Sequence, residues 1–160
     1  MFYKEKIVAL NELKTLRKKW ADAGEKVVFT NGCFDILHRG HVDYLNKAAN
    51  LGTKLIVAVN SDASVKGLKS TNRPLQDETS RLEIMASLGC VDAVILFGEQ
   101  TPLNLISTIV PDILVKGADY KVEEIVGYDV VTKHGGQVRT LDFLPGYSTT
   151  AIENKIKNGN

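Results

Sequence analysis

The sequence predicts a single α/β domain built on a doubly wound, Rossmann-like parallel sheet of five strands. Two observations carry this prediction. Five short runs rich in Val, Ile and Leu recur along the 160 residues, and segments with three- and four-residue apolar spacing alternate with them. Strands that are apolar on both faces are typical of parallel sheets covered by helices. Their alternation with helices favours a doubly wound sheet.

The predicted strands also indicate where a site would lie. They cover 26–30, 54–60, 92–97, 112–117 and 137–143. In a doubly wound sheet, ligands bind beyond the carboxyl ends of the strands, beside the point where the strand order reverses. We therefore expect the functional site near the residues that end or follow the strands, which are 30–32, 60–62, 97–98 and 116–119.

Helices are predicted over 9–23, 42–51, 77–89, 101–110 and 148–157. The first carries Leu13, Leu16 and Trp20 at helical spacing, which indicates one apolar face. Residues 1–24 are expected to form a helical extension ahead of the main domain over 25–160. A polar loop is expected over 66–76.

The helix boundaries rest on local signals. Gly52 and Gly89 are expected to end the second and third helices, and Asp77 to cap the third. Thr101 is expected to cap the fourth helix, with Pro102 at its first position, where a missing N–H costs nothing.

The composition indicates a soluble protein of the cytoplasm. Hydrophobic residues make up 44% and charged residues 24%, and the formal net charge is +1, so a nucleic-acid partner is not expected. The sequence has no apolar run of about 18 residues, so no membrane span is expected, and its N-terminus lacks the features of a signal peptide. Cys33 and Cys90 are isolated, which favours a reducing compartment over a disulfide framework.

The stretch FTNGCFDILHRGH, 29–41, carries the strongest functional signal. Gly32 lets the backbone turn close to a ligand after the first strand, and the N–H groups at a following helix start bind anions. His38 and His41 lie three residues apart across that start, and Gly40 leaves room for a phosphate to approach. Imidazoles aimed at phosphate oxygens stabilise the charge that grows as a phosphorus–oxygen bond breaks. Neither GxxxxGK[ST] nor GxGxxG is present, so a P-loop or dinucleotide site is not indicated.

Two other uses of this stretch stay open on spacing alone. Cys33, His38 and His41 could contribute to a zinc site, although a fourth ligand is not evident in the sequence. Cys33 could also act as a nucleophile beside a histidine, although no second feature calls for a covalent intermediate.

The same stretch resembles the signature of the HxGH nucleotidyltransferases. LIVAVNSDASVKGLK, NRPLQDETSR, PDILVKGADY and YSTTAIENKI are similar, in order and spacing, to the cytidylyltransferase-like domains of the heptose 1-phosphate adenylyltransferases. The resemblance covers about 25–157. It implies that a sugar 1-phosphate attacks the α-phosphate of ATP in line and that pyrophosphate leaves.

The resemblance also implies roles for individual residues. The catalytic residues would be His38, His41 and Lys69. The nucleotide and its phosphates would contact Thr30, Asn31, Gly32, Phe34, Gly40, Lys116, Gly117, Asp119, Ser148, Thr149 and Thr150. The sugar phosphate would contact Asp35, Arg73 and Arg81. Ser70 stands where the family has a glycine in the loop after Lys69.

Some of these residues have simpler explanations. Asp35 could hold its own loop in place, and Arg73 or Arg81 could be a surface charge. One hydroxyl among Ser148, Thr149 and Thr150 is expected to cap the last helix, because helix starts favour such residues.

The resemblance further implies Mg²⁺, held by the phosphates and water rather than by a protein carboxylate cage, and a homodimer.

Three alternative functions stay open. They are a GTP-dependent heptose 1-phosphate guanylyltransferase, a glycerol 3-phosphate-type cytidylyltransferase, and a nucleotide-binding regulator without catalysis. The chain has LDFLPGYSTT before the last helix, with Arg139 further upstream, where the glycerol phosphate enzymes tend to have an RTEGISTT-type motif.

Overall fold

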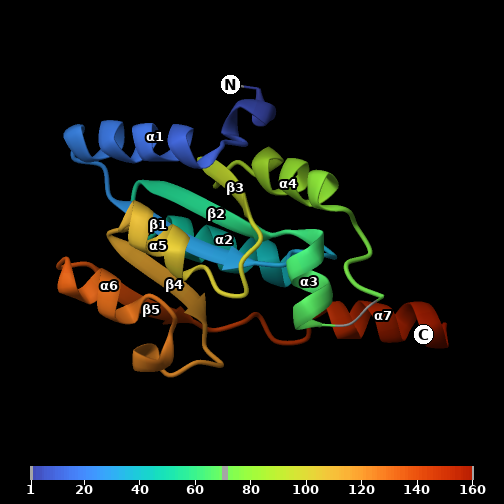
Figure 1. Cartoon of the computed structure of the whole chain (residues 1–160). Coiled ribbons are helices and arrows are strands. Elements are labelled where there is room, and N and C mark those ends of the chain that lie inside the picture. Colours follow the sequence, from blue (N-terminus) through green and yellow to red (C-terminus); the bar gives the residue numbers. More distant parts are fainter. Residues whose placement is uncertain (1, 70–71, 160) are drawn as a thin grey trace.

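A computed structural model describes residues 2–69 and 72–159 and confirms the predicted fold class (Figure 1). The five strands are β1 (Val27–Gly32), β2 (Lys54–Asn60), β3 (Ala93–Phe97), β4 (Ile113–Gly117) and β5 (Gln137–Leu141). They form one sheet in the order β3-β2-β1-β4-β5, and every pairing in it is parallel. The order reverses between β1 and β4, so the expected ligand crevice lies beyond their carboxyl ends.

Helices cover both faces of this sheet. They are α1 (Leu10–Asp22), α2 (Arg39–Ala49), α3 (Asp62–Leu68), α4 (Glu78–Ser87), α5 (Leu103–Ile109), α6 (Tyr128–Lys133) and α7 (Thr149–Asn158), with 3₁₀ turns over Tyr3–Lys6 and Val122–Glu124. Among the described residues, none of these helices has the length and apolarity needed to cross a membrane.

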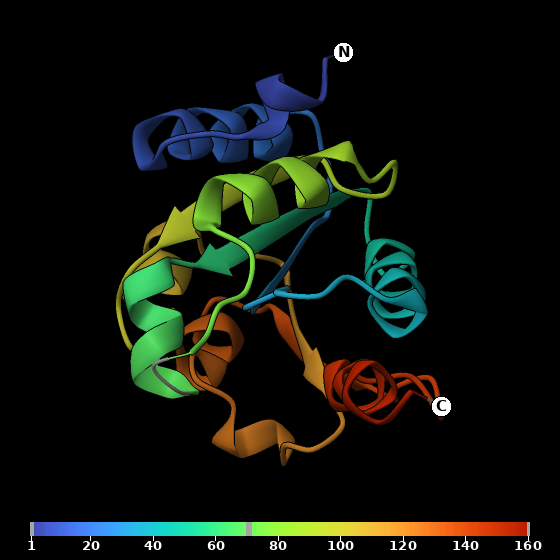
Figure 2. The ribbon, with the colours of Figure 1, turned by 90° about the vertical axis from the view of Figure 1, so that its right-hand side faces the viewer.

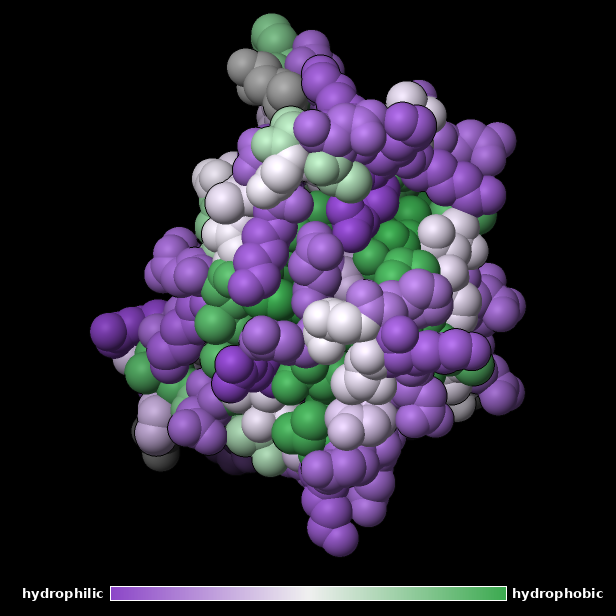
Figure 3. Space-filling view, turned by 90° about the vertical axis from the view of Figure 1, so that its left-hand side faces the viewer, coloured by the Kyte–Doolittle hydropathy of each residue, from purple (hydrophilic) through white to green (hydrophobic). Residues whose placement is uncertain are grey.

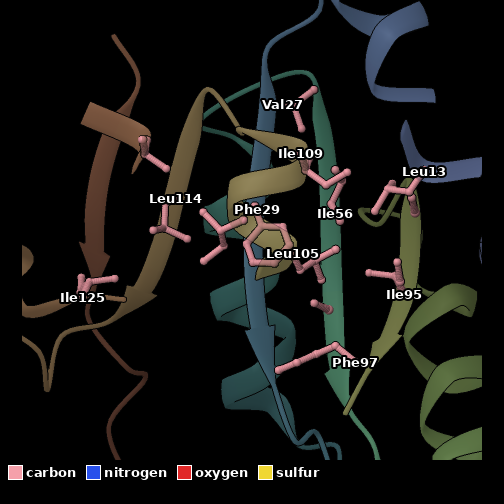
Figure 4. Packing of buried hydrophobic residues seen from close by; sticks show 14 residues of the cluster. Leu13, Val27, Phe29, Ile56, Ile95, Phe97, Leu105, Ile109, Leu114 and Ile125 are labelled. Carbon is pink, nitrogen blue, oxygen red and sulfur yellow. The ribbon is translucent and has the colours of Figure 1, made fainter. Parts of the chain in front are cut away.

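The core has one layer on each face of the sheet. Side chains of successive strand residues point to opposite faces, so Val27 and Phe29 join one layer and Val28 the other. The first layer packs beneath α1 and α5, where Leu13 of α1 is fully buried (Figure 4). The N-terminal helix therefore shares the core of the sheet, and the expected domain boundary at residue 24 stays a prediction.

Several predicted boundaries need correction. The loop expected over 66–76 begins later, because α3 covers 62–68 and is capped by Ser61, whose Oγ accepts from the N–H of Ser64 at 3.2 Å. Pro102 itself is the N-cap of α5, so Thr101 is not. The remark on Ser70 lies outside the described residues.

Two expected glycine stops were also wrong, by two residues and by one residue. Helix α2 ends with Asn50 as its C-cap and α4 with Leu88, each ahead of the predicted glycine. Helix α6 was not predicted. It has six residues and buries only Val131 among them, so the sequence there shows no repeated apolar spacing that would indicate a helix.

The two ends of the sheet look different. The end with the amino termini of the strands faces the viewer in Figure 3, where hydrophilic side chains surround small hydrophobic areas. The carboxyl end faces the viewer in Figure 2, where α2, α3 and α7 stand around the ends of the strands.

Candidate active site

A cavity of about 720 Å³ lies at the carboxyl ends of β1 and β4. Its wall is built by the segment from β1 to α2, the end of β4 and the segment that leads into α7. The lining residues that the sequence predicts are Asn31, Gly32, Phe34, Asp35, His38, Gly40, His41, Lys69, Lys116, Gly117, Asp119, Ser148 and Thr149. The structure therefore brings together at one pocket segments that are more than 100 residues apart in the chain.

The two histidines form a stacked pair at the start of α2. His38 is the N-cap of the helix, and its ring centroid lies 3.8 Å from that of His41, with 27° between the planes. The backbone N–H of His38 donates to Nδ1 of His41 at 3.4 Å. Phe34 packs edge-on against His41 at 5.5 Å between centroids. Packing on both sides thus fixes the position of His41 before any ligand binds.

Burial keeps both imidazoles neutral at pH 7. It lowers the pKa of His41 to about 4, with smaller contributions from the nearby His38 and Lys69, and it also lowers the pKa of His38. A neutral imidazole still carries one N–H, so each ring can donate one hydrogen bond to an anion.

Two lysines supply positive charge. Lys69 lines the pocket at the end of α3, and Lys116 lines it at the end of β4. Burial leaves the ammonium form of Lys116 poorly solvated and lowers its pKa to about 8. An anionic ligand would restore that pKa and gain a strong partner.

Two buried polar atoms of the pocket are unsatisfied. Within the described part of the chain, Oδ1 of Asn31 and Nδ1 of His38 have no hydrogen-bond partner. Buried polar atoms usually have one, and exceptions are frequent at functional sites. Both residues line the cavity, which agrees with a site that is completed by a polar ligand.

Asp35 holds a loop in place. Its buried carboxylate accepts from the backbone N–H groups of Leu75 and Gln76 at 2.8 and 2.9 Å and from Arg73 at 2.6 Å. Burial alone would raise the pKa of Asp35, but these hydrogen bonds outweigh it and lower the pKa. Arg73 also pairs with Glu153 of α7. The guanidinium thus joins two carboxylates and does not line the cavity.

Two predicted contact residues lie behind the pocket wall, which corrects their assignment. Arg81 is fully buried and donates to the carboxylate of Asp62 and the carbonyl of Cys33, both at 2.7 Å. Thr30 is also fully buried and shares a 2.8 Å hydrogen bond with the hydroxyl of Tyr44. Burial raises the pKa of that hydroxyl to about 12. Both residues support the wall because every polar atom that could reach a substrate is already engaged or covered.

The three hydroxyl residues before and within α7 take different positions. Ser148 caps the helix, and its Oγ accepts from the N–H of Ala151 at 3.1 Å. Ser148 and Thr149 line the pocket, whereas Thr150 does not.

The sequence predicted KGADY, which ends in Tyr120, as part of the pocket, but the rest of the aromatic wall, formed by Tyr44, Phe143 and Tyr147, was missed. Phe143 covers Gly117 so closely that a side chain at 117 would collide with its ring. The signal that could have found this part is FLPGY, two aromatic residues around a turn directly before the predicted hydroxyl cluster.

The zinc and nucleophile hypotheses gain no support. Among the described residues, no group of three or more His, Cys, Asp or Glu side chains is placed to hold a metal ion. Burial raises the pKa of the Cys33 thiol, which disfavours the reactive thiolate.

The family pattern described as cytidylyltransferase-like matches residues 29–155. The chain belongs to the cytidylyltransferase-like family. Its relatives include the bifunctional protein HldE of Rhodopseudomonas palustris (strain BisB18), 51% identical over 97% of this chain and 32% of the relative. The bifunctional protein HldE of Vibrio parahaemolyticus is 57% identical over 89% of this chain and 30% of the relative. The chain therefore spans about a third of the length of these curated relatives.

Two solved structures share the fold of this cytidylyltransferase-like chain. A lipopolysaccharide core biosynthesis protein from Thermoplasma volcanium superposes with a TM-score of 0.63 at 33% identity, covering 76% of this chain and 98% of that one. A pantoate–beta-alanine ligase from Francisella tularensis gives a TM-score of 0.63 at 16% identity, covering 94% of this chain and 76% of that one, which shows the fold alone.

Proposed function

We propose that the chain transfers the adenylyl group of ATP to D-glycero-D-manno-heptose 1-phosphate and releases pyrophosphate and ADP-heptose. The observation that supports nucleotidyl transfer is the neutral, packed histidine pair beside two lysines, at the crevice where the strand order reverses. The choice of heptose 1-phosphate rests on the resemblance of the NSD, LVKGADY and STT motifs and on the relatives named for bifunctional HldE and lipopolysaccharide core synthesis.

In this reaction an oxygen of the sugar phosphate forms a bond to the α-phosphorus of ATP as the bond to the bridging oxygen of pyrophosphate breaks. His38 and His41 donate N–H groups to the α- and β-phosphate oxygens, whose charge grows in the transition state. Lys69 and Lys116, which line the same pocket, neutralise the phosphates. Because the attacking oxygen is already anionic, the reaction needs no general base and no covalent enzyme intermediate.

The remaining wall fits the rest of the nucleotide. Asn31, Gly32, Phe34 and Gly40 border the phosphates, while Gly117 and Asp119 lie at the end of β4, where we place the ribose and base. Ser148 and Thr149 offer hydroxyl and N–H groups to the β- and γ-phosphates. We place the sugar phosphate beside the loop that Asp35 and Arg73 hold, without direct contact from Arg81.

Mg²⁺ would enter with the triphosphate and reduce the charge of the leaving pyrophosphate. The residues fit an ion that stays on the triphosphate, because Mg²⁺ keeps most of its water and phosphate ligands and the lining offers Lys69 and Lys116 to the phosphates themselves. By resemblance, we also expect a cytoplasmic homodimer whose partners are small molecules rather than nucleic acid or membrane.

The test is pyrophosphate release by the purified protein with Mg²⁺ and heptose 1-phosphate, with ATP, GTP and CTP in separate reactions. Turnover with ATP that is lost in His41→Ala supports the proposal, because positioned proton donors of this kind are worth about 100-fold to 10,000-fold. His134→Ala is the matched control, since His134 is exposed and does not line the pocket.

The other outcomes separate the alternatives. Turnover with GTP in place of ATP would make the product GDP-heptose. Reaction of CTP with glycerol 3-phosphate alone would overturn the sugar assignment and keep the mechanism. Nucleotide binding without pyrophosphate release would identify a regulator.

A further inference from the structure

Helix α7 is held to the molecule by few side chains. None of its residues, all of which are described, is buried, and in the segment from β5 to the helix most residues are exposed. The contacts that hold the region include Phe143, which lies over Gly117 and stacks on Tyr44 at 6.1 Å between ring centroids. Glu153 pairs with Arg73, and Tyr147 meets the start of α2. Ser148 and Thr149 can bind phosphate only while the start of α7 stays at the pocket, so these few contacts must hold it there.

The contact of Tyr147 with α2 is the one nearest the histidine pair. The guanidinium of Arg39 donates to the hydroxyl of Tyr147 at 3.0 Å and lies 5.3 Å from the centroid of its ring. A side chain at Gly40 would approach Cβ of Tyr147 at 3.2 Å, so the absence of one lets the two segments meet closely. The two residues are 108 positions apart, and Figure 2 shows α2 and α7 at neighbouring places around the carboxyl ends of the strands.

The position of this pair in the chain links it to both helix starts at the pocket. Arg39 lies directly between His38 and Gly40, and Tyr147 lies directly before Ser148. A shift of Tyr147 would therefore carry the hydroxyl and N–H groups of the α7 start away from the histidines. The pair is exposed, so its contribution to overall stability is small, and its effect should appear in ligand binding.

We propose that Arg39 and Tyr147 are positioning residues that hold the start of α7 against the start of α2, so that both helix starts bind one triphosphate. This inference rests on the proposed function for the identity of the ligand. The charge that grows in the transition state lies mainly near the breaking bond, at the oxygens that the histidines contact. The outer oxygens of the β- and γ-phosphates change less, so the α7 contacts to them act about equally in the ground state and the transition state. Loss of the pair should then raise KM for ATP and leave kcat nearly unchanged.

The experiment compares Tyr147→Phe, Arg39→Met and the double variant. Tyr147→Phe removes the hydrogen bond and keeps the ring. We expect each single variant to raise KM for ATP by about threefold to tenfold, the range of one ordinary hydrogen bond, because the pair is exposed to solvent, with kcat within about twofold. The double variant should raise KM for ATP no more than the single variant with the larger effect, because the two substitutions remove the same contact. Arg39→Lys, which keeps a cation beside the ring, should recover part of the loss.

Tyr128→Phe and Arg139→Met are the matched controls, since both residues lie away from the pocket, and both should keep the wild-type KM. Calorimetric Kd values for ATP, measured without any sugar phosphate, separate this inference from the proposed function. If heptose 1-phosphate does not react but the variants raise the Kd for ATP as expected, the pair is confirmed and the acceptor is wrong.

Additive effects of the two substitutions, a change in kcat alone, or an unchanged Kd and KM would overturn the inference. Absence of ATP binding by the wild-type protein would overturn it as well.

Discussion

The two helices whose starts meet at the pocket are held in opposite ways. Helix α2 buries Gly40, Tyr44, Leu45 and Ala48 against the sheet, whereas α7 buries none of its residues. The histidines thus stand on a helix anchored in the core, while Ser148 and Thr149 depend on contacts made by a few exposed or half-buried side chains. This difference suggests a division of tasks, in which α2 fixes the reacting phosphate and α7 adjusts to the leaving group. Each prediction below tests one side of that comparison.

The largest effect is expected from Gly40→Ala on the α2 side. A methyl group at this position would lie 2.9 Å from the ring of His38 and 3.2 Å from Cβ of Tyr147, so the histidine must move. Misplacement of a catalytic group by about 1 Å costs on the order of 100-fold in rate, and we expect kcat/KM to fall by about that factor. Steady-state kinetics of pyrophosphate release would measure it.

Gly89→Ala is the control for this substitution, because a methyl group there has open space and the backbone does not need glycine. Activity of Gly40→Ala equal to that of Gly89→Ala would show that the start of α2 tolerates movement and that the proposed rigidity is wrong.

The second effect concerns stability and comes from Arg81→Met. The substitution removes the donors to Asp62, to the carbonyl of Cys33 and to the carbonyl of Gln76 inside the wall. Breaking a buried ion pair of this kind costs about 3 kcal/mol of unfolding free energy. Urea unfolding would measure it, with the exposed Arg139→Met expected within about 0.5 kcal/mol of wild type. Similar losses in the two variants would mean that Arg81 does not support the pocket.

The third effect is the pH dependence that His41 gives to stability. Its pKa in the folded protein is about 4, below the ordinary value near 6.5. Between these values the unfolded chain binds more protons than the folded protein, so stability rises with pH through this window and stays level above it. Protonation therefore destabilises the fold as the pH falls from about 6.5 towards 4, and the burial of His38 acts in the same direction.

Urea unfolding at several pH values would show this effect. We expect wild type to lose about 2 kcal/mol more than His41→Asn between pH 7 and pH 4.5. The lowered pKa of Asp35 acts below about pH 3.8, outside this range. Parallel pH profiles for the two proteins would show that His41 is not buried in solution.

The same contrast explains how much could be predicted from the sequence. The fold and the α2 side were predictable because the required residues are local: apolar strand runs, Gly32 at a strand end, and two histidines around Gly40. Arg81 and Thr30 were misassigned because a residue type does not reveal burial, and Arg81 at a helix start is equally compatible with a solvent-facing charge. Tyr147 was missed because its partner Arg39 lies 108 residues away and neither residue has an obligatory role in phosphate chemistry.

The smallest effect, and the sharpest test of the α7 side, compares Ser148→Ala with Thr150→Ala. Ser148 caps α7 and lines the pocket. Thr150, two residues later, is exposed and does not line the pocket. Loss of the cap weakens the helix start by about 1 kcal/mol. No residue of α7 is buried, so core packing does not offset this loss, and the first turn of the helix should open more often. We expect Ser148→Ala to raise KM for ATP by about threefold to fivefold and to speed amide hydrogen exchange in 149–152. Thr150→Ala should leave KM within about twofold, since it removes neither a cap nor a pocket group. Equal effects of the two substitutions would mean that α7 acts through its general helix propensity, and the pocket contact assigned to Ser148 would then be wrong.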